Sequence, residues 1–156
     1  MDFRISGLPA PQFQPLFAMT DGQLEAIGAR CCYADDSRPG YPCRVSLMHA
    51  KPGEELILTS FQHQNANSPY RASGPIFVRK NATETFTAVN SVPDSLRVRL
   101  LSVRAYDSND LIVDAEVIEG INLETTLAHF FAQDSVAYLH VHNARRGCYA
   151  CRIDRA

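Results

Sequence analysis

Alternation of apolar and polar residues predicts that most of the chain forms β-strands. The strand signals are CRVSL, LILTSF, PIFVRK, LRVRLLSVRAY, LIVDAEVI, VAYLHVH and CYACRID, which all lie between residues 43 and 154. Three of the gaps between them, HAKPGEE, DSND and NARRG, have the composition of hairpin turns. The pattern therefore predicts about seven strands paired mostly antiparallel, with a β-bulge near Leu100 where the apolar phase switches.

Helical periodicity first appears after residue 19. The segment TDGQ places Gln23 three residues after Thr20, which is a capping-box pattern, and apolar residues follow at Leu24, Ile27 and Cys31. This helix should end before DDSRPGYP, because the prolines in that stretch cannot continue it. We therefore interpret Cys31 as a small buried residue on a helix.

A second helix is predicted from about Asn122. The segment NLETTLAHFFAQ brings four apolar side chains to one face at helical spacing: Leu123, Leu127, Phe130 and Phe131. This face should pack on the sheet, whereas His129 lies on the opposite side and should be exposed to solvent.

The order of these elements is typical of an α+β domain. One helix, five strands, a second helix and two strands suggest a curved, mostly antiparallel sheet covered by two helices. The chain has 156 residues and neither a repeat nor a linker, so one globular domain over 1–156 is expected. The proline-rich opening GLPAPQFQP predicts an extended N-terminal arm over 1–19.

Composition narrows the partners and the compartment. The net charge of −2 argues against a strong non-specific hold on nucleic acid or on an anionic membrane. The first residues, MDFRISGLPAPQF, lack the pattern of a secretory signal, and no run of about 18 apolar residues occurs, so we expect a cytoplasmic protein. An odd count of five cysteines is in keeping with free thiols.

Charge is distributed unevenly along the chain. Residues 56–83 and 135–156 are locally basic, whereas residues 107–134 carry seven acidic side chains and no Lys or Arg. Guanidinium recognises carboxylate and phosphate well, and 13 of the 15 cationic residues are Arg. The two basic segments could meet in space, although alternation of charge between surface segments is also common.

The stretch YLHVHNARRGCYAC contains the residues with the clearest chemistry. On a strand, His140 and His142 share one face, and Leu139 and Val141 occupy the other, more apolar face. Two neutral imidazoles on one face can bind Zn, Fe or Cu, so His140 and His142 are candidate metal ligands. The Cys-x-x-Cys motif should not complete that site, because its two thiols point to opposite faces of a regular strand.

The second conspicuous stretch is SPYRASGPIFVRK. Its prolines and glycine predict a rigid loop that could aim Tyr70, Arg71 and Ser73 at a ligand. The alternative is that these side chains only pin the loop to backbone carbonyls, and His63 has the same ambiguity. The anion-binding hypothesis places this loop opposite HVHNARRG, and its ligand-binding candidates are Tyr70, Arg71, Ser73, Arg79, Asn143 and Arg145.

Three segments together resemble a known family. PCRVSL, SPYRASGPIFVR and HVHNARRGC are similar to the bacterial family of domains of unknown function numbered 1203. The resemblance implies a bacterial stand-alone domain, and it assigns no catalytic residues because the family has no assigned activity.

Three functions remain open from the sequence. The first is a domain that binds a small anionic ligand, or an enzyme in which His140 and His142 are candidate proton donor and acceptor. The second is a metal-binding protein that uses the same two histidines, and the third is an interaction domain without pocket chemistry. No phosphate-binding glycine loop, nucleophile elbow or His-Glu-x-x-His motif is present, and no cofactor is expected. The sequence indicates no oligomeric state.

Overall fold

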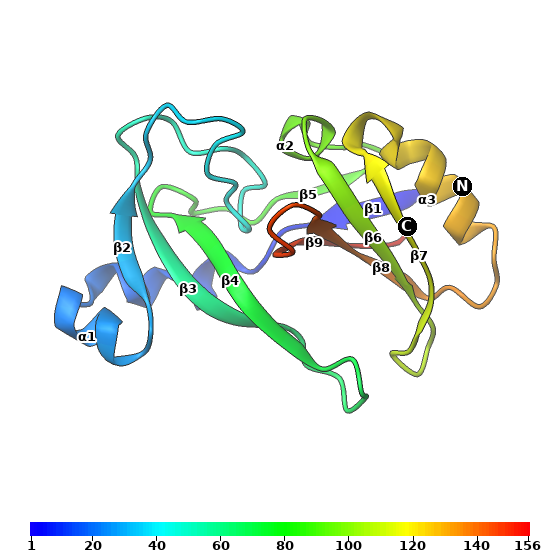
Figure 1. Cartoon of the computed structure of the whole chain (residues 1–156), viewed down its shortest axis with the longest axis horizontal. Helices are drawn as coiled ribbons and strands as arrows, with labels where there is room; N and C mark the ends of the chain where they lie inside the picture. Colours follow the sequence, from blue (N-terminus) through cyan, green and yellow to red (C-terminus); the bar gives the residue numbers. More distant parts are fainter.

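The computed structural model describes all residues from 1 to 156, and its strands form two antiparallel sheets. The larger sheet has six strands in the order β5-β1-β9-β8-β6-β7. Their bounds are β1 Phe3–Ser6, β5 Thr87–Val89, β6 Leu100–Tyr106, β7 Ile112–Glu119, β8 Tyr138–Asn143 and β9 Tyr149–Arg155. The smaller sheet has the order β2-β3-β4, with β2 Arg30–Tyr33, β3 Glu55–Gln64 and β4 Ala72–Arg79. Figure 1 shows the two sheets side by side.

One amphipathic helix covers one face of the six-stranded sheet. Helix α3 (Leu123–Phe131) buries the four apolar side chains of its stripe in the same core as Leu139 and Val141 of β8. This core contains 18 buried residues and accounts for most of the apolar interior. The face of β8 that carries Leu139 and Val141 therefore packs under α3, and its other face turns toward the smaller sheet.

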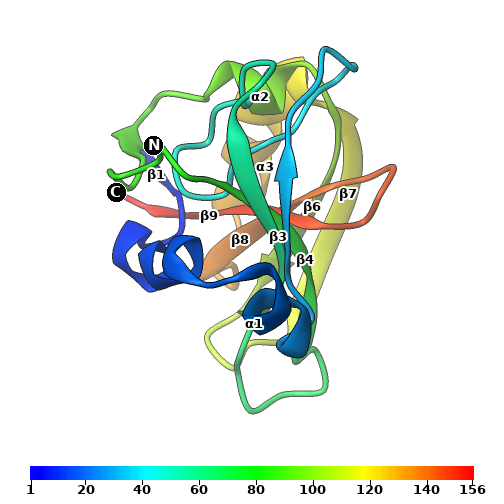
Figure 2. The same cartoon turned by 90° about the vertical axis from the view of Figure 1, so that its left-hand side faces the viewer.

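The smaller sheet is covered by the N-terminal helical segment. This segment contains the 3-10 helices η1 (Ala10–Gln12) and η2 (Gln14–Ala18) and the helix α1 (Asp21–Ala26). Leu24 of α1 packs with Ile57 of β3, and Leu16 and Phe17 lie against them. Figure 2 shows this segment on the outer side of the smaller sheet.

A further apolar cluster joins the two sheets. Tyr149 of β9 is buried with Ile76 and Val78 of β4 and with Phe13 of the N-terminal segment. Tyr149 thus connects the strand next to β8 with the smaller sheet, which brings the polar face of β8 close to β3.

The fold class expected from the sequence is confirmed. The molecule is α+β with antiparallel sheets, α3 begins and packs as expected, and Thr20 and Gln23 form the capping box. The hairpins β6–β7 and β8–β9 also form, around DSND and NARRG. His129 is exposed on α3.

Several local expectations are wrong. The first helix ends at Ala26, and Gly28 then adopts a positive φ of 75°, so that Cys31 lies on strand β2 and not on a helix. The stretch CRVSL is not a strand, and β3 pairs instead with β2 and β4. The phase switch near Leu100 marks the short helix α2 (Asp94–Arg97) followed by β6, not a bulge.

The N-terminal residues are not an extended surface arm. Strand β1 lies between β5 and β9 and forms antiparallel pairs with both, and the prolines that follow it open the 3-10 helices. Ile5 is fully buried in the main core. Strand pairing on both sides makes β1 an internal strand of the larger sheet, which composition alone does not indicate. No helix of the chain has the length and apolar character needed to cross a membrane.

Candidate functional site

Three histidine side chains converge between the two sheets. His63 comes from β3 of the smaller sheet, and His140 and His142 come from β8 of the larger one. One nitrogen of each ring lies within 4.8 Å of a nitrogen of the other two. Period-two alternation places His140 and His142 on the same face of β8, and the packing of the sheets brings His63 over that face.

Each of the three rings has a buried nitrogen without a hydrogen-bond partner. These atoms are Nδ1 of His63, Nδ1 of His140 and Nε2 of His142. His140 and His142 are only 3% and 1% exposed. Buried polar atoms are nearly always paired, because an unpaired one loses the hydrogen bonds that water would provide. The three nitrogens are therefore available to bind a further ligand.

A hydrogen bond shows which ring nitrogen of His142 carries the proton. Nδ1 of His142 lies 3.0 Å from the carbonyl oxygen of Gly147. A carbonyl oxygen only accepts, so Nδ1 carries the proton and donates it, and Nε2 retains its lone pair. Metal-bound histidines are commonly oriented by such a hydrogen bond to a backbone carbonyl.

All three imidazoles are held in the neutral form. Burial lowers the pKa of His140 to about 3, with smaller contributions from His142 and Arg152. Burial also lowers the pKa of His142 to about 4, against the effect of the Gly147 carbonyl, which raises it. The pKa of His63 is lowered by burial and then by Arg104. Neutral imidazole is the form that binds a metal ion.

Tyrosine rings surround the cluster. Tyr149 stacks on His63 with the ring centroids 5.3 Å apart, and Tyr106 and Tyr138 lie 5.1 and 5.3 Å from the ring of His140. The Tyr138 hydroxyl donates to Oδ1 of Asp110 at 2.6 Å and accepts from Nε2 of Gln64 at 2.8 Å.

The three tyrosines also stay neutral. Burial, followed by the hydrogen bond to Asp110, raises the pKa of Tyr138 to about 12. Burial likewise raises the pKa values of Tyr106 and Tyr149. The cluster therefore has neutral aromatic walls.

The anion-binding hypothesis pairs SPYRASG with HVHNARRG, whose residues 140–143 belong to β8 and whose remaining residues form the turn after it. The SPYRASG loop contacts the β6–β7 hairpin, where Oγ of Ser68 donates to the carbonyl oxygen of Asp110 at 3.0 Å. The ring of Tyr70 lies 6.3 Å from that of Tyr106, which pairs with Tyr138 at the start of β8. The NARRG turn instead follows the end of β8. The structure therefore does not bring the loop and the turn together.

The remaining candidates lie in three places. Arg71 and Ser73 belong to the SPYRASG segment and are exposed. Arg79 forms an ion pair with Glu54 at 2.7 Å and also donates to Ser46, so it is already paired. Asn143 and Arg145 line a surface hollow at the NARRG turn, together with Arg99.

The cysteines of the Cys-x-x-Cys motif are separated as expected. Cys151 is buried in the main core, whereas Cys148 accepts a hydrogen bond from Nη2 of Arg44 at 2.9 Å. All five thiols are free. The two cysteines of the motif therefore do not form a shared metal site.

Sequence patterns do not link His63 with His140 and His142, because it lies on a different sheet. The arginines that gather beside the NARRG turn were also missed, and they are Arg38, Arg44, Arg99 and Arg146. These arginines come from separate segments of the chain, and only the tertiary structure brings them together. The double arginine of NARRG was the one local signal.

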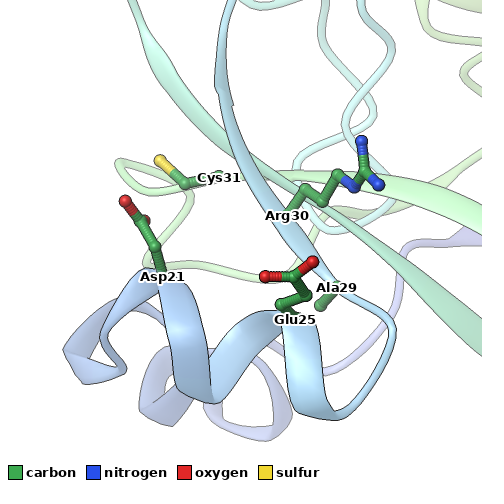
Figure 3. A pocket seen from close by; sticks show the side chains of 5 residues that line it. All are labelled: Asp21, Glu25, Ala29, Arg30 and Cys31. Atoms are coloured by element: carbon green, nitrogen blue, oxygen red, sulfur yellow. The ribbon is translucent and has the colours of Figure 1, made fainter.

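A hollow beside α1 is less promising. It measures about 330 Å³ and is lined by Asp21, Glu25, Ala29, Arg30 and Cys31. Figure 3 shows Asp21 and Cys31 pointing to one side of it and Arg30 directed away from them. Sγ of Cys31 contacts Oε1 of Glu55 at 3.5 Å, and no side chain lining the hollow has a buried unpaired polar atom. We assign no function to this hollow.

Comparisons with known proteins identify a family but no activity. The family model described as protein of unknown function, DUF1203, matches residues 40–155. This range includes the three histidines and the arginines beside the NARRG turn except Arg38. No curated protein and no solved structure matches the chain.

Proposed function

Because the chain belongs to the DUF1203 family, whose function is unknown, we propose a function from its own geometry: it binds one transition-metal ion through His63, His140 and His142. The observation that carries this proposal is the convergence of three imidazole nitrogens within 4.8 Å of one another. Each ring also has a buried nitrogen without a partner, and a metal ion would supply one.

The donor set selects a class of metal. Neutral imidazole suits Zn, Cu, Fe and Ni, whereas Mg and Ca prefer oxygen ligands. No Cys, Asp or Glu joins the three histidines in this cluster. Structural zinc sites are closed by four protein ligands, and catalytic ones commonly use three and leave one position to water or substrate. Three histidines therefore support a centre with an open position.

The surroundings suit such a centre. The carbonyl of Gly147 holds the ring of His142, and Tyr149 stacks on His63. Both contacts limit ring rotation, which preorganises ligands for a metal. Because His140 and His142 are neutral at pH 7, a metal ion would not have to displace protons from them.

Metal titration tests this proposal. Protein stripped with a chelator should take up Co²⁺ or Zn²⁺ at about one ion per chain, as the three-ligand site requires. The Co²⁺ absorption bands should report imidazole ligands in a distorted tetrahedral field. Removing any one ligand should weaken metal binding by at least about 100-fold, because the loss of a residue that only orients a ligand already costs about 10-fold to 100-fold. The variants that test this are His63→Ala, His140→Ala and His142→Ala.

His129→Ala is the matched control, because His129 is exposed on α3, which packs on the face of β8 opposite to His140 and His142. It should leave the affinity and the stoichiometry unchanged. A His63→Ala variant that binds Co²⁺ as tightly as the unmodified protein would contradict the three-histidine site. Failure of the unmodified protein to bind Co²⁺ and Zn²⁺ would contradict the proposal as a whole.

A further inference from the structure

A second site lies in a cleft beside the β8–β9 turn. The cleft has a volume of about 240 Å³ and is formed by residues 37–42, Arg44, Phe77, Arg99 and the NARRG turn. Four guanidinium groups line it, those of Arg38, Arg44, Arg99 and Arg146. No Asp or Glu lines the cleft, and Glu119 appears only in the adjoining hollow that shares Arg38, Arg99 and Arg146.

None of the four arginines has a carboxylate partner. The four ion pairs of the molecule involve other cations, namely Arg79, Lys80, Arg97 and Arg152. Arg44 is only 2% exposed, and it donates to the carbonyl oxygens of Tyr149 and Pro42 and to Sγ of Cys148. Burying a cation among neutral acceptors is costly, and an anion in the cleft would offset that cost.

The cations also act on one another. Burial, followed by the charges of nearby groups that include Arg44 and Arg146, lowers the pKa of Arg99. Burial lowers the pKa of Arg44 as well. An anion bound among them would relieve this mutual repulsion.

Two of the arginines are held in place and two are free. Nη2 of Arg99 donates to the carbonyl oxygen of Gly40 at 3.0 Å, and its Nε lies 3.4 Å from Nε2 of His49. Arg44 makes three hydrogen bonds, and Arg99 bonds through Nε and Nη2. Each guanidinium therefore has two of its five N–H donors unused. Arg38 and Arg146 are exposed and make no side-chain hydrogen bond, so they can close on a ligand.

We propose that this cleft binds a phosphate-like oxyanion, either free or as the phosphoryl group of a small metabolite. Guanidinium groups bind such anions through paired charge-assisted hydrogen bonds, and Asn143 adds a polar side chain to the lining. The volume lies below the range of about 300–1,000 Å³ that is usual for drug-sized ligands, which favours a small ligand. The proposal is independent of the metal centre.

Titration with inorganic phosphate tests the cleft directly. We would use metal-free protein at constant ionic strength, so that phosphate bound to a metal ion is not counted. Phosphate should saturate the protein, and the double substitution Arg38→Gln with Arg146→Gln should weaken binding by at least about tenfold, as the loss of one charge-assisted hydrogen bond implies. Both residues are exposed, so these substitutions should preserve the fold.

The matched control is Arg4→Gln with Arg30→Gln, which removes the same charge from exposed positions outside the cleft. It should leave phosphate affinity unchanged. Equal losses in the two double variants, or no phosphate binding at constant ionic strength, would overturn the proposal. Glycerol phosphate provides a second arm: tighter binding than phosphate supports a metabolite, and equal binding supports the free oxyanion.

The thiol of Cys148 gives an independent readout, because it lines the cleft and contacts Arg44. Iodoacetamide is uncharged, so phosphate does not compete with it through charge. If bound phosphate blocks the cleft, alkylation of Cys148 should slow by about tenfold when nine-tenths of the sites are occupied. The peptide that contains Cys31 and Cys32 is the internal reference and should react at an unchanged rate. If phosphate binds and the rate at Cys148 does not change, the anion site lies elsewhere.

Discussion

At the scale of single residues, the proposed metal site requires that each imidazole of the histidine cluster stays neutral. His140 and His142 are buried among aromatic rings, and burial is the main reason that their pKa values fall to about 3 and about 4. In the unfolded chain a histidine titrates near pH 6.5. The unfolded state therefore takes up protons at a higher pH than the folded state does.

This difference predicts a loss of stability in mild acid. Above about pH 6.5 both states are neutral at these positions, so the contribution of the two histidines is complete. As the pH falls from 6.5 toward 4, the unfolded state is protonated first, and the free energy of unfolding should fall by up to about 1.4 kcal/mol per pH unit for each histidine. Urea unfolding of metal-free protein between pH 7.5 and 4.5 measures this slope.

Two variants isolate the effect of the cluster from that of other titrating groups. His140→Phe keeps an aromatic ring in the same space and should lower the slope by about the share of one histidine. His129→Ala removes an exposed histidine and should leave the slope unchanged. Equal slopes for His140→Phe and the unmodified protein would show that folding does not lower the pKa of His140.

At the scale of elements, the connection between β7 and α3 depends on a close backbone contact. Gly120 opens η3 (Gly120–Asn122), and a Cβ atom at this position would overlap the carbonyl oxygen of Leu96 in α2. The amide of Gly120 also donates to the carbonyl oxygen of Arg99 at 2.8 Å. The absence of a side chain at Gly120 lets α2 and η3 pack against each other.

Replacing Gly120 with Ala should therefore destabilise the fold. The clash is with backbone atoms, which cannot rotate away, so we expect the free energy of unfolding to fall by about 2–4 kcal/mol, the upper part of the range for single substitutions. Gly22→Ala in α1 is the control, because a Cβ there meets nothing within 4 Å and Ala is the better helix former. Denaturant melts of both variants make the comparison, and similar stabilities would refute the clash.

At the scale of the whole molecule, the histidine cluster links the two sheets. His63 belongs to β3, and His140 and His142 belong to β8. The same region is joined by Tyr149 and by the hydrogen bond from Gln64 of β3 to the hydroxyl of Tyr138 on β8. A metal ion bound by all three rings would add a link between β3 and β8, which belong to different sheets.

Metal binding should thus protect both strands from hydrogen exchange. At a zinc concentration 100 times the dissociation constant, exchange in β3 and β8 should slow by up to about 100-fold, which corresponds to about 2.7 kcal/mol. The short helix α1, which lies outside the junction, should change much less. Hydrogen exchange measured by mass spectrometry makes this test. Protection of β8 without β3 would indicate a two-histidine site.

The sequence by itself determined the features that depend on local periodicity. The apolar stripe of α3, the hairpins at DSND and NARRG and the shared face of His140 and His142 were all readable, because side-chain direction follows from the period of a helix or a strand. The same reasoning failed where local patterns were ambiguous. At Cys31 an apolar spacing that suits a helix also occurs on β2, and at LRVRLL the end of α2 continues directly into β6.

Only the tertiary structure decided which elements meet. Periodicity predicts that His140 and His142 share a face, but not that His63 of another sheet lies over it. It also does not predict that Arg44 is buried beside Arg99, with the NARRG turn across the cleft and the SPYRASG loop at the far end of β8. These contacts join residues that are far apart in sequence, and they result from the burial of apolar faces elsewhere in the fold. The hydrophobic effect is non-directional, so the local sequence around a polar residue does not show which other polar residues it will meet.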